Sequence, residues 1–84
     1  MNQITIYTTK VCPYCVKAKL LLQKKGLKYN EIDASDEKIR EEMILKAAGR
    51  RTVPQIFFGT KHIGGCDDLY ALENKGELDK LLQQ

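Results

Sequence analysis

The sequence predicts an α/β fold in which helices flank a four-stranded mixed sheet, in the order β, α, β, α, β, β, α. Strand-like runs rich in β-branched and aromatic residues alternate with segments whose apolar residues recur at helical spacing. The last two strand-like runs are separated only by Gly59-Thr60, which is the length of a hairpin turn. With 84 residues there is room for one core, so we expect residues 1–84 to form a single domain.

The first half of the chain predicts two strands and two helices. Residues 4–7 alternate apolar with semi-polar side chains, and a helix is expected from Pro13 to about Lys25. Residues 27–33 form a weaker strand pattern. Ser35, followed by acidic residues, is expected to cap a second helix that closes at Gly49.

The second half predicts a hairpin and a third helix. Residues 55–58 are a nearly continuous apolar strand, and residues 61–63 return beside it in the antiparallel direction. Asp67 is expected to cap a third helix that ends at Gly76, and residues 78–82 form a final short amphipathic turn. Because a parallel strand pair joined by a helix crosses right-handed, the first helix begins at the carboxyl edge of the sheet, where ligands of open α/β sheets bind.

Composition and charge exclude several classes of function. The formal net charge is +3, and basic residues are interspersed with acidic ones, so we expect no nucleic-acid partner. No stretch approaches the roughly 20 apolar residues of a membrane span. The first nine residues lack the basic start and apolar run of a secretion signal, so we expect a cytoplasmic protein. A small anionic ligand suits the modest positive charge of the chain better than a nucleic acid does.

The strongest chemical signal is Cys12-Pro13-Tyr14-Cys15, which begins the first predicted helix after a strand. In a reducing compartment a pair of this kind is typical of a redox dithiol. Unpaired N–H groups and the positive end of the helix dipole stabilise a thiolate on Cys12, and Lys10 adds a nearby positive charge. Such surroundings lower a thiol pKa from about 8.5 to roughly 3.5–7.5. We therefore expect Cys12 to attack first and Cys15, one turn further along, to resolve the mixed disulfide.

The alternative for this pair is half of a zinc site. Four-coordinate structural zinc needs two further ligands, and only Cys66 and His62 remain to supply them. We therefore expect no metal. Tyr14 is interpreted as a flat wall for a substrate, whereas residues 50–51 and His62 are interpreted as solvated surface.

The second motif is Thr52-Val53-Pro54, which precedes a strand that looks central. A cis proline fits the entry of such a strand, because it would leave the backbone of Val53 free to pair with an extended peptide. The alternative is an ordinary trans turn.

The third motif is Gly64-Gly65-Cys66-Asp67-Asp68. Its backbone N–H groups suit a carboxylate and its aspartates suit an ammonium, so together they suit the zwitterionic end of a ligand. The alternative is a glycine turn followed by a helix cap. Cys66 is expected to be a small packed residue there.

Together the three motifs resemble those of the dithiol glutaredoxins, over about residues 4–82. The resemblance implies a thioredoxin-like fold, with the first strand between the second, parallel, and the third, antiparallel. It also implies that glutathione binds in one groove. The implied contacts to glutathione come from Lys10, Tyr14, Arg40, Thr52, Val53, Pro54, Gly65, Cys66, Asp67 and Asp68. In one departure, many members carry a lysine three residues before the first cysteine, where this chain has Thr9.

The activity that the resemblance implies is glutathione-dependent reduction of protein disulfides and glutathione mixed disulfides, with glutathione reductase and NADPH supplying electrons. The implied partners are disulfide-containing or glutathionylated proteins, ribonucleotide reductase among them, and the chain is expected to be a monomer. Two alternatives stay open. One is a redoxin reduced by thioredoxin reductase, which the glycine–aspartate motif disfavours; the other is an iron–sulfur scaffold bridged by Cys12 and glutathione, which Pro13 disfavours.

Overall fold

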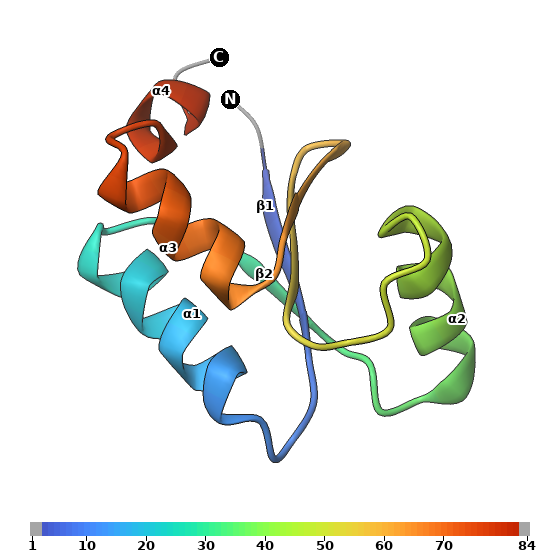
Figure 1. The fold of residues 1–84 in the computed structure, drawn as a ribbon. Helices are drawn as coiled ribbons and strands as arrows, with labels where there is room; N and C mark the ends of the chain where they lie inside the picture. Colours follow the sequence, from blue (N-terminus) through green and yellow to red (C-terminus); the bar gives the residue numbers. More distant parts are fainter. Residues whose placement is uncertain (1–2, 83–84) are drawn as a thin grey trace.

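The computed structural model describes residues 3–82 (Figure 1). Its elements follow the predicted order, and the final amphipathic turn is a short fourth helix. They are β1 (Ile4–Thr8), α1 (Pro13–Lys24), β2 (Asn30–Asp33), α2 (Glu37–Lys46), β3 (Gln55–Phe58), β4 (Lys61–Gly64), α3 (Cys66–Asn74) and α4 (Leu78–Leu82).

The four strands form one mixed sheet in the order β2-β1-β3-β4. β1 is parallel to β2 and antiparallel to β3, and β3 is antiparallel to β4. In this register Tyr7 of β1 lies opposite Ile32 on one side and Gln55 on the other. The predicted thioredoxin-like topology is therefore confirmed, and α1 begins at the carboxyl edge of the central strand β1.

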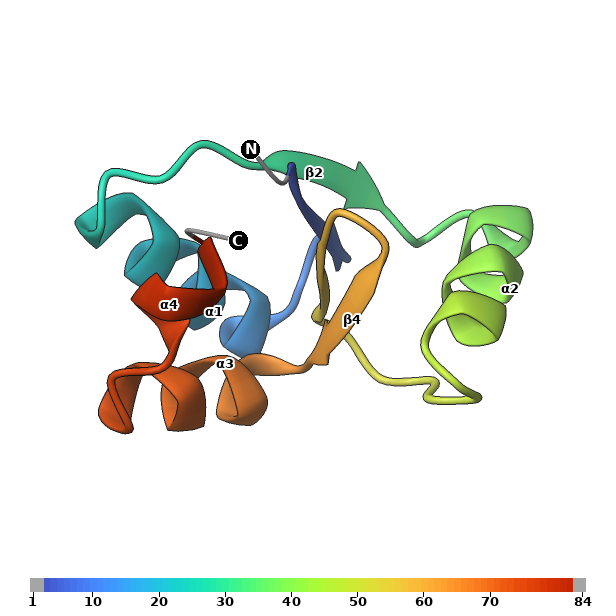
Figure 2. The same cartoon turned by 90° about the horizontal axis from the view of Figure 1, so that it is seen from above.

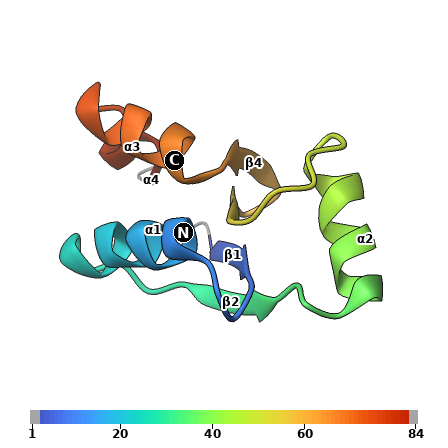
Figure 3. The same ribbon diagram turned by 60° about the horizontal axis from the view of Figure 1, so that its bottom comes forward.

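Helices cover both faces of the sheet. Figures 2 and 3 show α1, α3 and α4 on one side of the strands and α2 on the other. Because side chains alternate along a strand, Ile4 and Ile6 pack toward α1 and α3, whereas Tyr7 packs toward α2. The larger core comprises Ile4, Ile6, Ala18, Leu21, Leu22, Ile56, Phe58, Cys66, Leu69 and Leu78. The smaller core, under α2, comprises Tyr7, Ala34, Met43, Ala47 and Phe57.

Polar contacts hold α1 in the helical layer. Lys25, at the end of α1, places its Nζ 2.9 Å from a carboxylate oxygen of Glu73 and 2.9 Å from one of Asp79. The carboxylates of Glu73 and Asp79 raise the pKa of Lys25. Nearer the start of α1, the hydroxyl of Tyr70 donates to the carbonyl of Lys17 at 3.0 Å. The helix that begins at the dithiol is thus fixed along its length.

Two predicted boundaries in the first half of the chain differ from the structure. Asp36, not Ser35, caps α2, and its carboxylate accepts the N–H of Lys38 at 2.8 Å. The N–H of Ser35 donates instead to the carboxylate of Asp33, so Ser35 belongs to the turn before the helix. β2 begins at Asn30 because residues 27–29 approach the sheet without pairing, while Leu27 packs against the larger core. Within residues 3–82, no helix is long and apolar enough to cross a membrane.

Two leucines of α1 give a matched test of this packing. Leu22 is fully buried, whereas Leu20 is 56% exposed. We predict that Leu22→Ala lowers the free energy of unfolding by about 2–5 kcal/mol, because it leaves a cavity in the core. Leu20→Ala should change it by less than about 0.5 kcal/mol. Urea denaturation measures both, and equal losses would contradict the assignment of the two helix faces.

Candidate active site

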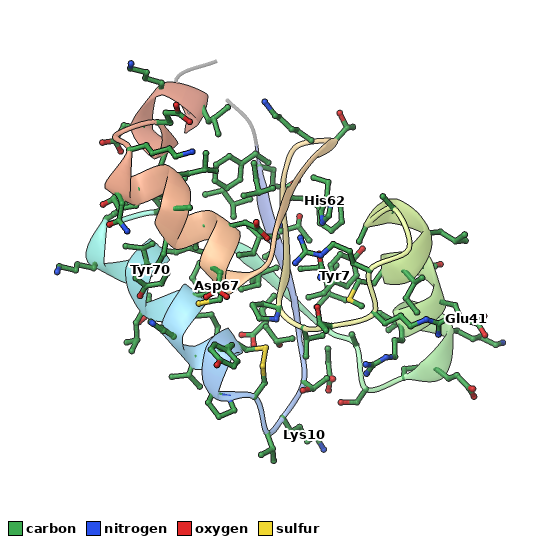
Figure 4. All side chains as sticks on the ribbon, viewed as in Figure 1. Tyr7, Lys10, Glu41, His62, Asp67 and Tyr70 are labelled. Carbon is green, nitrogen blue, oxygen red and sulfur yellow. A yellow bond between two sulfur atoms is a disulfide. The ribbon has the colours of Figure 1, made fainter. Side chains whose placement is uncertain are left out.

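The two cysteines of the first motif lie at the start of α1 (Figure 4). Cys12 is the N-cap residue, and its Sγ accepts the backbone N–H of Cys15 at 3.1 Å. Pro13 occupies the first turn, where its missing N–H costs no hydrogen bond. The two sulfurs are joined as a disulfide, with the Cα atoms 5.2 Å apart. The helix start therefore points a hydrogen-bond donor and the positive end of its dipole at the sulfur of Cys12.

The two sulfurs differ in accessibility. Cys15 is only 1% exposed, because it lies on the buried face of α1, whereas Cys12 is half-buried. An incoming disulfide therefore reaches Cys12 first. Cys15 is positioned to attack only a sulfur already bonded to Cys12.

The second motif lies beside this sulfur. The Val53–Pro54 peptide bond is cis, as the sequence favoured. The carbonyl oxygen of Val53 lies 3.7 Å from Sγ of Cys12. The backbone of Val53 consequently borders the dithiol.

An open groove of about 300 Å³ adjoins the dithiol. All three motifs contribute to its walls, and so does one arginine. The lining residues are Tyr14, Arg50, Thr52, Val53, Pro54, Gly65, Cys66, Asp67 and Asp68. The structure thus brings together every predicted glutathione-contacting residue except Lys10 and Arg40.

Lys10 and Arg40 lie outside this lining. Lys10, on the loop after β1 (Figure 4), borders a separate hollow that also contains Glu31 and Asp33. Nη2 of Arg40 donates to the carbonyl oxygen of Arg51 at 2.9 Å. Arg40 therefore supports the loop that leads to the second motif.

The third motif forms one end of the groove. α3 begins at Cys66 with Gly65 as its N-cap, so the prediction that Asp67 caps the helix is wrong. The cause is Asp68, whose carboxylate reaches back to accept the N–H of Gly65 at 2.8 Å. Gly64 has φ +123°, and a β-carbon there would collide with the Asp68 carboxylate. Asp67 remains exposed at the helix start (Figure 4).

Arg50 is a groove residue that the sequence analysis missed. It is exposed, as predicted, but its Nη1 lies 2.8 Å from the carboxylate of Asp68. The Arg50 guanidinium and the N–H of Gly65 hold the pKa of the Asp68 carboxyl below its ordinary value. No sequence pattern linked Arg50 to Asp68, because the two come together only when the second and third motifs fold against each other.

The interpretation of His62 as solvated surface is wrong. Its ring is half-buried, with its centroid 4.9 Å from that of Phe57, and burial lowers the pKa of His62. Its Nε2 lies 2.7 Å from Oε1 of the fully buried Gln55. Nε2 of Gln55 donates to the carbonyl oxygen of Thr52 at 2.9 Å. Because Oε1 of Gln55 only accepts, Nε2 of His62 carries the hydrogen. β4 is thereby linked to the loop that forms the groove.

The third cysteine is packed, as expected. Cys66 is 4% exposed, and burial raises the pKa of its thiol. Among the described residues, no three histidine, cysteine or acidic side chains are grouped so that they could hold a metal ion.

Comparisons with known proteins agree with this site. The glutaredoxin family model matches residues 4–63. Glutaredoxin 1 of Rickettsia prowazekii is 52% identical over 85 residues, covering 99% of this chain and 90% of that protein. The solution structure of a glutaredoxin from Brucella melitensis is 57% identical, with a TM-score of 0.86 over 98% of this chain and 89% of that one. A buckwheat glutaredoxin–glutathione complex is 32% identical, with a TM-score of 0.85 over 98% and 77%.

A dithiol at a helix start, beside a cis-proline loop on a mixed sheet, defines a thiol–disulfide oxidoreductase with a thioredoxin-like fold. The family model covers most of the chain, and relatives about half identical to it span nearly its whole length. The chain belongs to the glutaredoxin family. Its dithiol is a redox centre, and its activity is glutathione-dependent thiol–disulfide exchange.

Asp68 gives a pH-dependent test of the groove. Its pKa is lower in the folded chain than in the unfolded chain, so its stabilising contribution is complete above the ordinary aspartate pKa of about 3.9 and is lost as pH falls through the folded pKa. We predict that Asp68→Asn, which still accepts from Gly65, is less stable than the wild type near neutral pH. The difference in unfolding free energy should shrink below about pH 4.

Urea denaturation at a series of pH values measures this difference. Asp67→Asn is the matched control, because Asp67 is the neighbouring exposed aspartate. The ion pair would be contradicted if the difference in unfolding free energy between the wild type and Asp68→Asn stayed constant or grew on acidification.

Proposed function

We propose that Cys12 is the attacking thiolate, that glutathione occupies the groove, and that the chain reduces both protein disulfides and glutathione mixed disulfides. The observation that carries the proposal is the position of Sγ of Cys12. It accepts the N–H of Cys15 at the helix start, and it lies 3.7 Å from the Val53 carbonyl that borders the groove. One sulfur is thus both stabilised as an anion and placed beside a ligand site.

With a glutathione mixed disulfide, the thiolate of Cys12 attacks the glutathionyl sulfur. A Cys12–glutathione disulfide forms, and the substrate sulfur leaves as a thiolate that takes a proton from solvent. A second glutathione thiolate then attacks the sulfur of the bound glutathione, which releases glutathione disulfide and returns Cys12 as a thiolate. This route needs only one protein thiol.

With a protein disulfide, Cys12 first forms a mixed disulfide with one substrate sulfur and releases the other. Cys15 then attacks Cys12, which frees the second substrate thiol and leaves the Cys12–Cys15 disulfide. Two glutathione molecules reduce that disulfide in turn and become glutathione disulfide. The burial of Cys15 fits it to this second step, because only a partner already bound to Cys12 lies within its reach.

The groove supports glutathione as the ligand because different parts of the groove suit different parts of that molecule. The backbone of Val53 pairs with the cysteinyl residue of the ligand, while Thr52, Pro54 and Tyr14 form walls. The first turn of α3, from Cys66, receives the γ-glutamyl carboxylate, and the ammonium group faces Asp67 and Asp68. The structure of the buckwheat relative is a complex with glutathione, which agrees with this assignment.

The glycine carboxylate of glutathione is assigned to Tyr14, Lys10 and Arg40. Lys10 is exposed, and its long side chain is flexible. Arg40 contacts the loop before the second motif through the carbonyl oxygen of Arg51.

The setting that suits this chemistry is the cytoplasm, where glutathione keeps thiols reduced. The protein partners are disulfide-containing or glutathionylated proteins, with ribonucleotide reductase as one example, and the chain acts as a monomer.

The three cysteines allow a matched test of the mechanism. We predict that Cys12→Ser is inactive toward every substrate, because the attacking sulfur is gone. Cys15→Ser should keep reduction of glutathione mixed disulfides and lose reduction of protein disulfides, because only the second route uses Cys15. Cys66→Ser is the control and should keep both activities. The measurement is NADPH consumption coupled through glutathione and glutathione reductase, and an active Cys12→Ser would overturn the proposal.

The same assay distinguishes the electron donors. Replacing glutathione and its reductase with thioredoxin reductase should abolish NADPH consumption. Equal turnover with thioredoxin reductase would favour the alternative redoxin. Visible absorption after anaerobic purification would favour the alternative iron–sulfur scaffold.

A further inference from the structure

Exposed apolar side chains gather around the dithiol. Among the residues whose side chains the structure describes, five large hydrophobic residues are strongly exposed, and four of these lie between residues 11 and 20. One of them, Tyr14, belongs to the groove. The other three are Val11, Val16 and Leu20, which are 91%, 52% and 56% exposed. Neither the core nor the groove uses them.

Val16 and Leu20 lie on one face of α1, and Val11 lies just before the helix. Val16 and Leu20 are one helical turn apart, and Pro13 lies three residues before Val16, so the three share one face. That face is opposite the buried Cys15 and Ala18. We call Val11, Pro13, Val16 and Leu20 the α1 strip. It begins next to Cys12 and extends about 12 Å along the helix axis.

Val11, Val16 and Leu20 each keep more than half of their surface exposed, so the rest of residues 3–82 leaves this side of α1 largely uncovered. A helix that faced only water would carry polar residues there. An apolar strip that the fold leaves uncovered, beside reactive sulfurs, indicates a contact surface.

The chain segment that carries the α1 strip is basic. Residues 10–30 contain six lysines and no aspartate or glutamate. Lys19 and Lys25 are held in ion pairs with Glu31 and with Glu73 and Asp79. Lys17 and Lys24, which flank the α1 strip, pair with no acidic side chain within residues 3–82, and both are exposed. The complementary partner surface is therefore apolar and acidic.

We infer that the α1 strip docks an apolar, acidic segment of the protein whose disulfide is being reduced. The inference rests on the proposed function. When the glutathionyl part of a mixed disulfide occupies the groove, the protein part must extend from Cys12 on another side. Val11 and Pro13 flank Cys12 in the sequence and lead from it onto the outer face of α1. The flanking lysines then attract the acidic residues of the docked segment.

Two other occupants fit less well. A second copy of the chain, docked strip to strip, would bring Lys17 and Lys24 of both copies together, and like charges in a contact oppose binding. An anionic lipid surface suits the lysines, but it would cover Cys12 and block the exchange reaction. A segment of a protein substrate matches both the charge and the chemistry.

The test compares two peptides of equal length, each carrying one glutathionylated cysteine. One peptide has leucine and aspartate residues beside the cysteine, and the other has leucine and lysine residues. The mixed disulfide of glutathione and 2-mercaptoethanol serves as a small substrate that is too short to reach Leu20. The wild type should reduce the acidic peptide with the higher kcat/KM, and rising salt should narrow the difference.

The variant Val16→Ser/Leu20→Ser should lower kcat/KM for the acidic peptide by about five- to tenfold, through KM. Its activity on the small substrate should stay unchanged, which shows that the variant is folded and that the proposed function still holds. Leu45→Ser is the matched control, since Leu45 is 82% exposed on α2, away from the dithiol. Leu45→Ser should leave kcat/KM unchanged for both peptides and for the small substrate.

Three results would overturn the inference. One is an unchanged kcat/KM for the acidic peptide in the double variant. Another is an equal loss on both peptides and on the small substrate. The third is a concentration-dependent dimer of the wild type that the double variant abolishes, because this would assign the α1 strip to a second copy. If the wild type does not reduce the small substrate at all, the proposed function itself is rejected.

Discussion

The site depends on one hydrogen bond, from the backbone N–H of Cys15 to Sγ of Cys12. It exists because α1 begins at Pro13, so the first turn has no helical carbonyl for that N–H. The helix in turn is held by Leu22 in the core and by Lys25 at its far end. Packing remote from the sulfur thus keeps a donor pointed at it, and this arrangement distinguishes the dithiol from two cysteines on a flexible chain.

The groove depends on contacts between segments that are distant in sequence. Gln55 lies fully buried in β3 and links His62 of β4 to the carbonyl of Thr52. Arg50 bridges from the other end of this loop to Asp68 of α3. The loop with the cis-proline is therefore held from both sides, while one backbone carbonyl remains beside the sulfur of Cys12. A rigid backbone edge of this kind lowers the entropy cost of binding an extended ligand.

The sequence predicted what local patterns determine: the order of elements, the helix start at the dithiol and the three motifs of the site. It did not predict features that need tertiary structure. Ser35 and Asp36 are both good caps, and only the acceptor offered by Asp33 decides between them. In the sequence, His62 has the pattern of a surface residue, and only the folded sheet brings its ring beside Gln55 of β3. The family resemblance implied that Lys10 contacts the ligand, but the loop after β1 places it beside Glu31 and Asp33.

The central claim is that the helix start stabilises the thiolate of Cys12. The most direct measurement is a pH titration of thiolate ultraviolet absorbance in Cys15→Ser/Cys66→Ser, which leaves Cys12 as the only thiol and keeps the backbone N–H of residue 15. The account predicts an apparent pKa well below the value of about 8.5 for a free thiol, which returns to that value when the chain is unfolded in urea. The same pKa in the folded and unfolded chain would contradict it.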